Sequence, residues 1–186
     1  MADIFIQSIA DIEFEKIYGE LSELRRQKID NIKNEEQKLL SAAAELALNK
    51  AVKAWFPDMQ LPVDYKYDEN GKPYLCDERA YISLSHSGEL AVCAISKNRV
   101  GVDVQEVKTV KQGLAERFFS EKDIAYINSA RDKKKAFFEV WVKNEARVKL
   151  TGNGISGGLK SDNDSYKYTF QSLDGDKYLI CVCEEL

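Results

Sequence analysis

The chain has 186 residues, which suits one domain or two small halves that share a core. Hydrophobic residues make up 44% and charged residues 31% of the sequence, as in folded rather than disordered proteins. The net charge of −4 argues against a nucleic-acid-binding protein, because such proteins normally carry a basic surplus.

The sequence also argues against export and membrane insertion. Its first residues contain no basic segment followed by an apolar run, so we expect no signal peptide. No stretch approaches the ~20 apolar residues of a membrane span, and we therefore expect a cytoplasmic protein with no membrane contact. The four cysteines include no C-x-x-C pair, so we expect reduced, mostly buried thiols. The chain has a single histidine, which excludes a His-rich zinc site.

The first predicted elements are a helix and then strands. Apolar residues recur at helical spacing between residues 23 and 55, and Phe56-Pro57 ends the pattern because proline cannot continue a helix. Residues 63–107 alternate or run apolar as buried antiparallel strands do, with turns at Asn70-Gly71 and Ser87-Gly88.

The second part of the chain follows the same order. A mixed segment at 117–127 precedes a predicted helix from about 134 to 150. A Gly-rich turn at 151–158 follows, and the chain closes with a hairpin that turns at Asp174-Gly175.

Helix followed by strands, twice over, indicates the α+β class with antiparallel sheets. We divide the chain into an N-terminal half at 1–99 and a C-terminal half at 100–186. No linker rich in proline, glycine or serine separates them, so we expect the halves to pack as one unit with a ligand site between them.

The predicted strand at 100–107 carries a candidate metal site. Its valines face one side, whereas Gly101, Asp103 and Gln105 face the other, and the glycine leaves room for a bulky neighbour. One interpretation is a half-exposed strand with a surface aspartate. The other is a Mg²⁺ site, because this ion needs only one or two protein carboxylates when phosphates and waters supply the remaining ligands.

The predicted second helix carries a glutamate in its apolar stripe. Glu145 continues the series Phe138, Trp141 and Val148 at helical spacing, where an unpaired carboxylate is costly. The alternative is a surface pair with Lys149 one turn later, which contributes roughly 0.3–0.5 kcal/mol. We favour the inward-facing interpretation, in which Glu145 completes the Mg²⁺ site and Lys149 meets a phosphate.

The serine-rich turn at 83–88 contains the single histidine. A lone histidine is more often structural than a ligand, and Ser85 and His86 make a poor catalytic pair because neighbouring strand residues point apart. The turn suits an anion, since hydroxyl, imidazole and backbone amides converge there. Lys38 and Lys72, taken alone, are typical of solvated lysines.

Four segments occur in order: NGKPYL at 70–75, SLSHSG at 83–88, VGVDVQEV at 100–107 and FFEVWVKNEARVKLTG at 137–152. From Leu21 to Gly154 the chain thereby resembles the Sfp-type 4'-phosphopantetheinyl transferases. The resemblance implies two similar α+β halves related by a pseudo-two-fold axis, with coenzyme A in the cleft between them. Smaller relatives with one such half must assemble to build the cleft, so we expect a monomer.

The resemblance also implies roles for individual residues. The Mg²⁺ ligands would be Asp103, Gln105 and Glu145. Contacts to the phosphates of coenzyme A would come from Lys72, Ser85, His86 and Lys149. The nucleotide 3'-phosphate would meet Lys38, with Arg26 as a weaker candidate nearby.

The implied reaction moves the 4'-phosphopantetheine arm of coenzyme A to a serine of an apo acyl or peptidyl carrier protein and releases 3',5'-ADP. Glu145 is the candidate base, and His86 and Lys149 act mainly as positioning groups. The sequence does not distinguish fatty-acid, polyketide and nonribosomal-peptide carrier proteins.

Two positions depart from the family pattern. Gln105 stands where many members have Glu, and Asn144 replaces the lysine that precedes the metal-binding glutamate; Lys143 lies about 100° round the helix. An active enzyme would need that cation from Lys143 after a helix shift, or from a lysine of the first half. The alternatives are a degenerate homologue that binds coenzyme A without transferase activity, and a plain α+β interaction domain. We favour the active enzyme.

Overall fold

The computed structural model describes residues 1–152 and 165–186. The elements of the first half are β1 (Asp3–Ser8), α1 (Phe14–Ile17), α2 (Glu23–Asp30), α3 (Glu35–Trp55), β2 (Tyr65–Tyr67), β3 (Pro73–Leu75), β4 (Tyr81–Ser87) and β5 (Leu90–Ser96). Those of the second half are β6 (Val100–Glu106), α4 (Leu114–Phe118), α5 (Glu121–Ser129), α6 (Lys133–Thr151), β7 (Tyr166–Leu173) and β8 (Tyr178–Glu185). The Gly-rich turn predicted at 151–158 lies, from residue 153 on, outside the described residues.

The strands form two three-stranded antiparallel sheets, in the orders β1-β5-β4 and β6-β8-β7, and β2 pairs with β3 in a small hairpin. In each sheet the last strand of the half lies in the middle. Strand β5 lies between β1 and β4, and β8 lies between β6 and β7. The prediction of an α+β fold with antiparallel sheets is therefore confirmed. The pseudo-two-fold relation between the halves stays a prediction.

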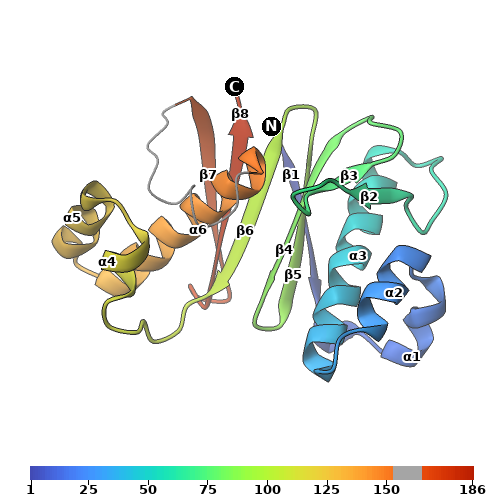
Figure 1. Cartoon of the computed structure of the whole chain (residues 1–186), viewed down its shortest axis with the longest axis horizontal. Coiled ribbons are helices and arrows are strands. Elements are labelled where there is room, and N and C mark those ends of the chain that lie inside the picture. The colour runs from blue at the N-terminus through green and yellow to red at the C-terminus, as the bar shows by residue number, and fades with distance from the viewer. Residues whose placement is uncertain (153–164) are drawn as a thin grey trace.

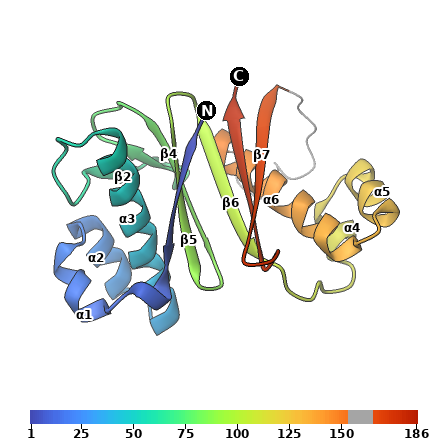
Figure 2. The ribbon, with the colours of Figure 1, turned by 180° about the vertical axis from the view of Figure 1, so that it is seen from behind.

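The sheets lie between two long helices (Figure 1). Helix α3 covers the outer face of the first sheet and α6 covers the outer face of the second, and the opposite view shows the strands again in the middle (Figure 2). The inner faces meet in a core that includes Val92 of β5, Val102 of β6 and Ile180 of β8. This buried apolar layer joins the two halves, and its burial is the main force that holds them together.

The helix predicted at 23–55 is broken into α2 and α3. Asn34 caps the start of α3, because its side chain accepts a hydrogen bond from the backbone N–H of Gln37 at 2.9 Å. The predicted end is confirmed, since Phe56 caps the last turn of α3. The missed signal was the asparagine itself, which favours caps over helix interiors.

The structure also describes the last hairpin, the cysteines and the apolar character of the helices. The hairpin with its turn at Asp174-Gly175 is confirmed by the pairing of β7 with β8. All four cysteines are free thiols, and three of them are buried. Within residues 1–152 and 165–186, no helix combines the length and the apolar character needed to cross a bilayer.

Gly101 allows α6 to lie directly against β6. A Cβ atom at this position would lie 1.9 Å from the carbonyl oxygen of Ala146 and 2.5 Å from the backbone nitrogen of Leu150. The expectation that Gly101 leaves room for a bulky neighbour is confirmed, and that neighbour is the backbone of helix α6. This close approach brings the side chains of α6 next to those of β6.

A row of serine hydroxyls joins the two sheets. The backbone N–H groups of residues 102, 104 and 106 on β6 donate to the Oγ atoms of Ser83, Ser85 and Ser87 on β4, at 3.0, 3.3 and 3.0 Å. Buried N–H groups need an acceptor, and these hydroxyls supply it in place of a main-chain ladder. The row fixes how far β4 and β6 are shifted along each other.

We predict that Gly101→Ala destabilises the protein by at least about 1–3 kcal/mol, the usual cost of overpacking, because both atoms that the new methyl meets belong to the backbone. Urea unfolding followed by circular dichroism measures this loss. Gly19→Ala is the control, since nothing lies within 4 Å of its Cβ position, and it should change stability by less than about 0.5 kcal/mol. Equal losses in the two variants would contradict the packing argument.

Candidate active site

Asp103 lies at the centre of a buried polar cluster between β4, β6 and α6. Its side chain is 2% exposed, so the interpretation as a surface aspartate was wrong. Oδ1 accepts hydrogen bonds from Ser85 Oγ and from Lys149 Nζ, both at 2.7 Å, and Oδ2 accepts from Gln105 Nε2 at 3.1 Å. The carboxylate is therefore held in one orientation by groups from three elements.

Glu145 faces inward from α6, as predicted, and is 8% exposed. Burial raises the pKa of its carboxyl, the nearby Asp103 raises it further, and Lys149 opposes the shift. Lys149 forms its ion pair with Asp103 at 2.7 Å. Two carboxylates thus share one ammonium group, and the excess negative charge favours a divalent cation.

The cluster has the donor atoms that Mg²⁺ uses. Asp103 and Glu145 supply two carboxylates, which is the usual protein share when phosphates and waters complete the shell. The described residues contain no group of three or more His, Cys, Asp or Glu side chains suited to a metal. Gln105 directs its amide nitrogen to Asp103 and its oxygen to Ser87, so the amide must turn over before its oxygen could join the carboxylates.

A cavity of about 180 Å³ adjoins this cluster, between the β2–β3 hairpin, β4 and the end of α6. Lys72 and Lys149 line it from opposite halves of the chain. Lys72 Nζ donates to the carbonyl oxygen of Leu150 at 2.8 Å, and burial, with a smaller effect of Arg99, lowers the pKa of Lys72 to about 8. Two ammonium groups on one small cavity make it suited to phosphate oxygens.

A second cavity, of about 280 Å³, shares Gly71, Pro73 and Leu84 with the first and extends toward α2 and α3. His86 lines it, on the face of β4 opposite Ser85. Partial burial lowers the pKa of His86, and Lys149 and other nearby cations lower it further, which favours the neutral imidazole. The two cavities are therefore neighbours, and basic side chains line both.

The sequence did not identify three further residues of this second cavity, which are Arg25, Lys28 and Ser41. Arg25 is 3% exposed, and its Nη2 is a buried nitrogen without a hydrogen-bond partner among the described residues. The signal was weak, because an arginine in a charged helix resembles a surface residue until its partners are known.

Two of the predicted phosphate contacts do not line the two cavities. Lys38 pairs with Glu35 at 2.7 Å, and Arg26 donates to the carbonyl oxygen of Leu21 at 2.8 Å. Ser85 Oγ donates to Asp103 and accepts from Lys149 Nζ, on the far side of β4 from His86. The roles of these three residues toward coenzyme A stay predictions.

The side chain of Asn144 points away from the basic cavities. It is 2% exposed, and its Nδ2 lies 3.5 Å from Asp123 Oδ2 on α5. The ammonium group of Lys143 lies over the ring of Tyr168, 5.0 Å from its centroid. Lys72, a lysine of the first half, lines the same cavity as Lys149, so this cavity has two cations without a lysine at position 144.

The comparisons with known proteins point to one family. The model of the 4'-phosphopantetheinyl transferase superfamily matches residues 99–183. The 4'-phosphopantetheinyl transferase psf-1 of Bacillus pumilus is 39% identical over 100 residues, which are 52% of this chain and 43% of that protein. The 4'-phosphopantetheinyl transferase gsp of Aneurinibacillus migulanus is 33% identical over 93 residues, 49% of this chain and 39% of that protein.

A longer match joins both halves to a single relative. The 4'-phosphopantetheinyl transferase Sfp of Bacillus subtilis (strain 168) is 25% identical over 153 residues, which are 80% of this chain and 68% of that protein. The chain is thus similar to 4'-phosphopantetheinyl transferases in both of its halves, and the family model itself covers residues 99–183. It spans less than half of the length of psf-1 and of gsp.

We predict that Lys72 makes stability rise with pH above about 8. Its folded pKa of about 8 lies below the ordinary lysine value, so between about pH 8 and 10 the unfolded chain binds a proton that the folded protein lacks. Below pH 8 both states are protonated and the penalty of burying the charge is complete. Urea unfolding at about pH 7 and pH 9.5 measures the free energy of unfolding of wild type and of Lys72→Met. Relative to the variant, wild type should be more stable at pH 9.5 than at pH 7. Lys66→Met, at an exposed lysine on β2, is the control and should shift little.

Asn144→Lys should give no gain in transfer activity. The new ammonium group would be directed toward Asp123 and α5 rather than toward the cavity that Lys72 and Lys149 line. Steady-state kinetics against a carrier protein measures the effect. An increase of about ten- to a hundredfold, the value of a new charge-assisted contact, would show that a cation is missing from the phosphate site.

Proposed function

We propose that the chain transfers the 4'-phosphopantetheine arm of coenzyme A to a serine of an apo acyl or peptidyl carrier protein, with Mg²⁺, and releases 3',5'-ADP. One observation carries the proposal: the buried carboxylates of Asp103 and Glu145 lie beside a cavity that Lys72 and Lys149 line from two halves of the chain. This combination of charges suits a metal-bound diphosphate.

The two cavities suggest how coenzyme A lies. Its diphosphate would occupy the cavity of Lys72 and Lys149, next to the carboxylates. Its nucleotide 3'-phosphate would occupy the second cavity, where Arg25, Lys28 and His86 supply the donors that we first assigned to other residues. Because the cavities share the hairpin residues 71 and 73, one extended ligand spans both.

The reaction needs no covalent enzyme intermediate. The carrier serine oxygen forms a bond to the phosphorus that bears the pantetheine arm, the bond from that phosphorus to 3',5'-ADP breaks, and Glu145 accepts the serine proton, directly or through water. Bound Mg²⁺ would neutralise charge on the diphosphate. Lys149 and Lys72 hold the phosphates, Ser85 and Gln105 orient Asp103, and His86 positions the nucleotide end.

A degenerate homologue that binds coenzyme A without transfer remains the second candidate, and Gln105 is the observation that favours it, because it replaces a charged ligand with a neutral one. Lys72 and Lys149 weigh against it, since together they supply two cations to the cavity without a lysine at position 144. The monomeric state and the type of carrier protein are part of the proposal.

Mass spectrometry of apo carrier proteins from fatty-acid, polyketide and nonribosomal-peptide systems tests the proposal. Each carrier is incubated with the protein, coenzyme A and Mg²⁺. A gain of one phosphopantetheine group identifies the activity and the carrier together. Binding of coenzyme A without any such gain would favour the degenerate homologue, and no binding would favour the interaction domain.

We predict that Asp103→Ala and Glu145→Gln each weaken Mg²⁺ binding by at least ~100-fold, because each removes one of two anionic ligands. Calorimetry with Mg²⁺ in the presence of coenzyme A measures the affinity, transfer should fall in parallel, and circular dichroism checks the fold. Glu139→Gln is the control, since this half-buried glutamate of α6 accepts a hydrogen bond from Tyr126 away from the site. Near-normal Mg²⁺ affinity in either variant would remove that residue from the metal site.

A further inference from the structure

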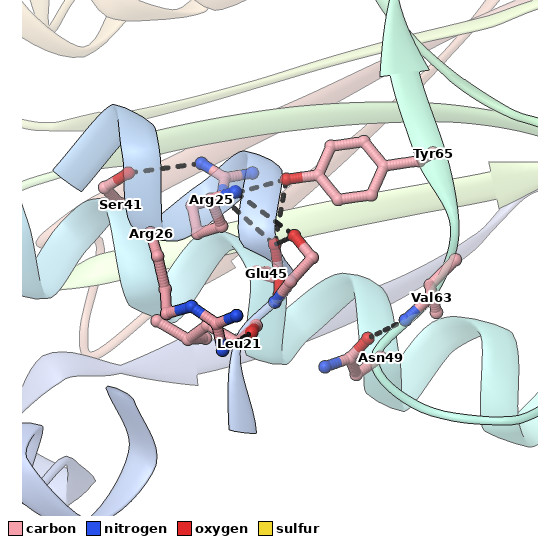
Figure 3. A network of polar contacts seen from close by, with 9 residues as sticks. Leu21, Arg25, Arg26, Ser41, Glu45, Asn49, Val63 and Tyr65 are labelled. Atoms are coloured by element: carbon pink, nitrogen blue, oxygen red, sulfur yellow. Dashed lines mark hydrogen bonds and ion pairs between the residues drawn. The ribbon is translucent and has the colours of Figure 1, made fainter. Parts of the chain in front are cut away.

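A buried network holds Arg25 against the second cavity (Figure 3). Its Nε donates to Tyr65 Oη at 3.0 Å and lies 3.4 Å from Glu45 Oε2, and its Nη1 donates to Ser41 Oγ at 3.2 Å. Ser41 also lines the cavity, so the guanidinium end of the side chain lies at the cavity wall. Nη2 is the remaining donor, buried and without a partner among the described residues.

Glu45 is the base of this network and is fully buried. It accepts hydrogen bonds from the backbone N–H of Ser22 at 2.6 Å, from Ser22 Oγ at 2.7 Å and from Tyr65 Oη at 2.9 Å. Burial raises the pKa of Tyr65, so its hydroxyl stays protonated and donates to Glu45 while it accepts from Arg25. Both oxygens of the carboxylate are therefore satisfied inside the protein.

The contacts around Arg25 leave one nitrogen, Nη2, without a hydrogen-bond partner among the described residues. A guanidinium is planar, so fixing Nε and Nη1 also fixes the direction of Nη2. A buried donor without a partner is unfavourable in the free protein, and an anion in the cavity would satisfy it. Because the arginine is already ordered, binding that anion costs little side-chain entropy.

We propose that Glu45 and Tyr65 are positioning residues that hold Arg25 for the nucleotide 3'-phosphate and thereby set a preference for coenzyme A over 3'-dephospho-coenzyme A. This inference rests on the proposed function, in which the second cavity takes the nucleotide end. Glu45 and Tyr65 do not line the second cavity, and they act on the ligand only through their bonds with the Arg25 side chain.

The experiment compares the Kd of coenzyme A with that of 3'-dephospho-coenzyme A by calorimetry in the presence of EDTA, so that the metal site does not contribute. For wild type we expect coenzyme A to bind about ten- to a hundredfold more tightly, the value of a charge-assisted hydrogen bond. Glu45→Gln and Tyr65→Phe should each reduce this ratio at least about fivefold, and Arg25→Ala should bring it close to one. Affinity for the dephospho compound should change little.

Asn49→Ala is the matched control. Asn49 lies one turn after Glu45 on α3, is also buried, and its Oδ1 accepts a hydrogen bond from the backbone N–H of Val63 at 3.1 Å, away from Arg25 (Figure 3). Its loss should lower stability and leave the ratio at the wild-type value. The ratio therefore separates positioning of Arg25 from general damage to the first half.

Several results would overturn the inference. A folded Tyr65→Phe or Glu45→Gln protein with the wild-type ratio would show that Arg25 needs no such support. A ratio near one in wild type would remove the 3'-phosphate from this cavity while binding of coenzyme A, and with it the proposed function, still stood. No binding of either compound to wild type, with Mg²⁺ present as well as in EDTA, would reject both the inference and the proposed function. If Glu45→Gln does not fold, Tyr65→Phe decides the question, because it removes only a hydroxyl.

Discussion

The direct contact between α6 and β6 is the constraint on which the candidate site depends. A strand and a helix can approach to backbone distance only where no Cβ atom intervenes, and Gly101 provides that position. Two residues along the strand, Asp103 then faces Glu145 and Lys149 of the helix. The packing of the second half thereby brings the two carboxylates near each other, and Asp103 raises the pKa of the Glu145 carboxyl.

The first half contributes the rest of the site through a different kind of contact. The serines of β4 accept hydrogen bonds from β6, and Ser85 in the middle of the row also donates to Asp103. The residues that flank this row on the other face of β4, Leu84 and His86, line the second cavity. Because side chains alternate along a strand, β4 contacts the Asp103 cluster with one face and the second cavity with the other.

Sequence periodicity was sufficient for the class of fold, the inward position of Glu145 and the burial of the cysteines, because each depends on which face of a single element is apolar. It was insufficient where an outcome depends on contacts between elements. Lys38 and Arg25 both lie in charged helical segments, yet Arg25 is buried against Glu45 of another helix, whereas Lys38 pairs locally with Glu35. The direction of Asn144 likewise depends on α5, whose position no spacing within α6 reveals.

The shared layer between the sheets has a consequence for how the protein unfolds. Val92 on one side and Val102 and Ile180 on the other bury each other, and Glu184 of β8 bonds to Ser96 of β5 across the same boundary. If either half melted, the other would present an open apolar sheet to water and lose acceptors for its strand amides. We therefore expect the two halves to unfold together, and the cavity that Lys72 and Lys149 line from the two halves exists only while this single cooperative unit is intact.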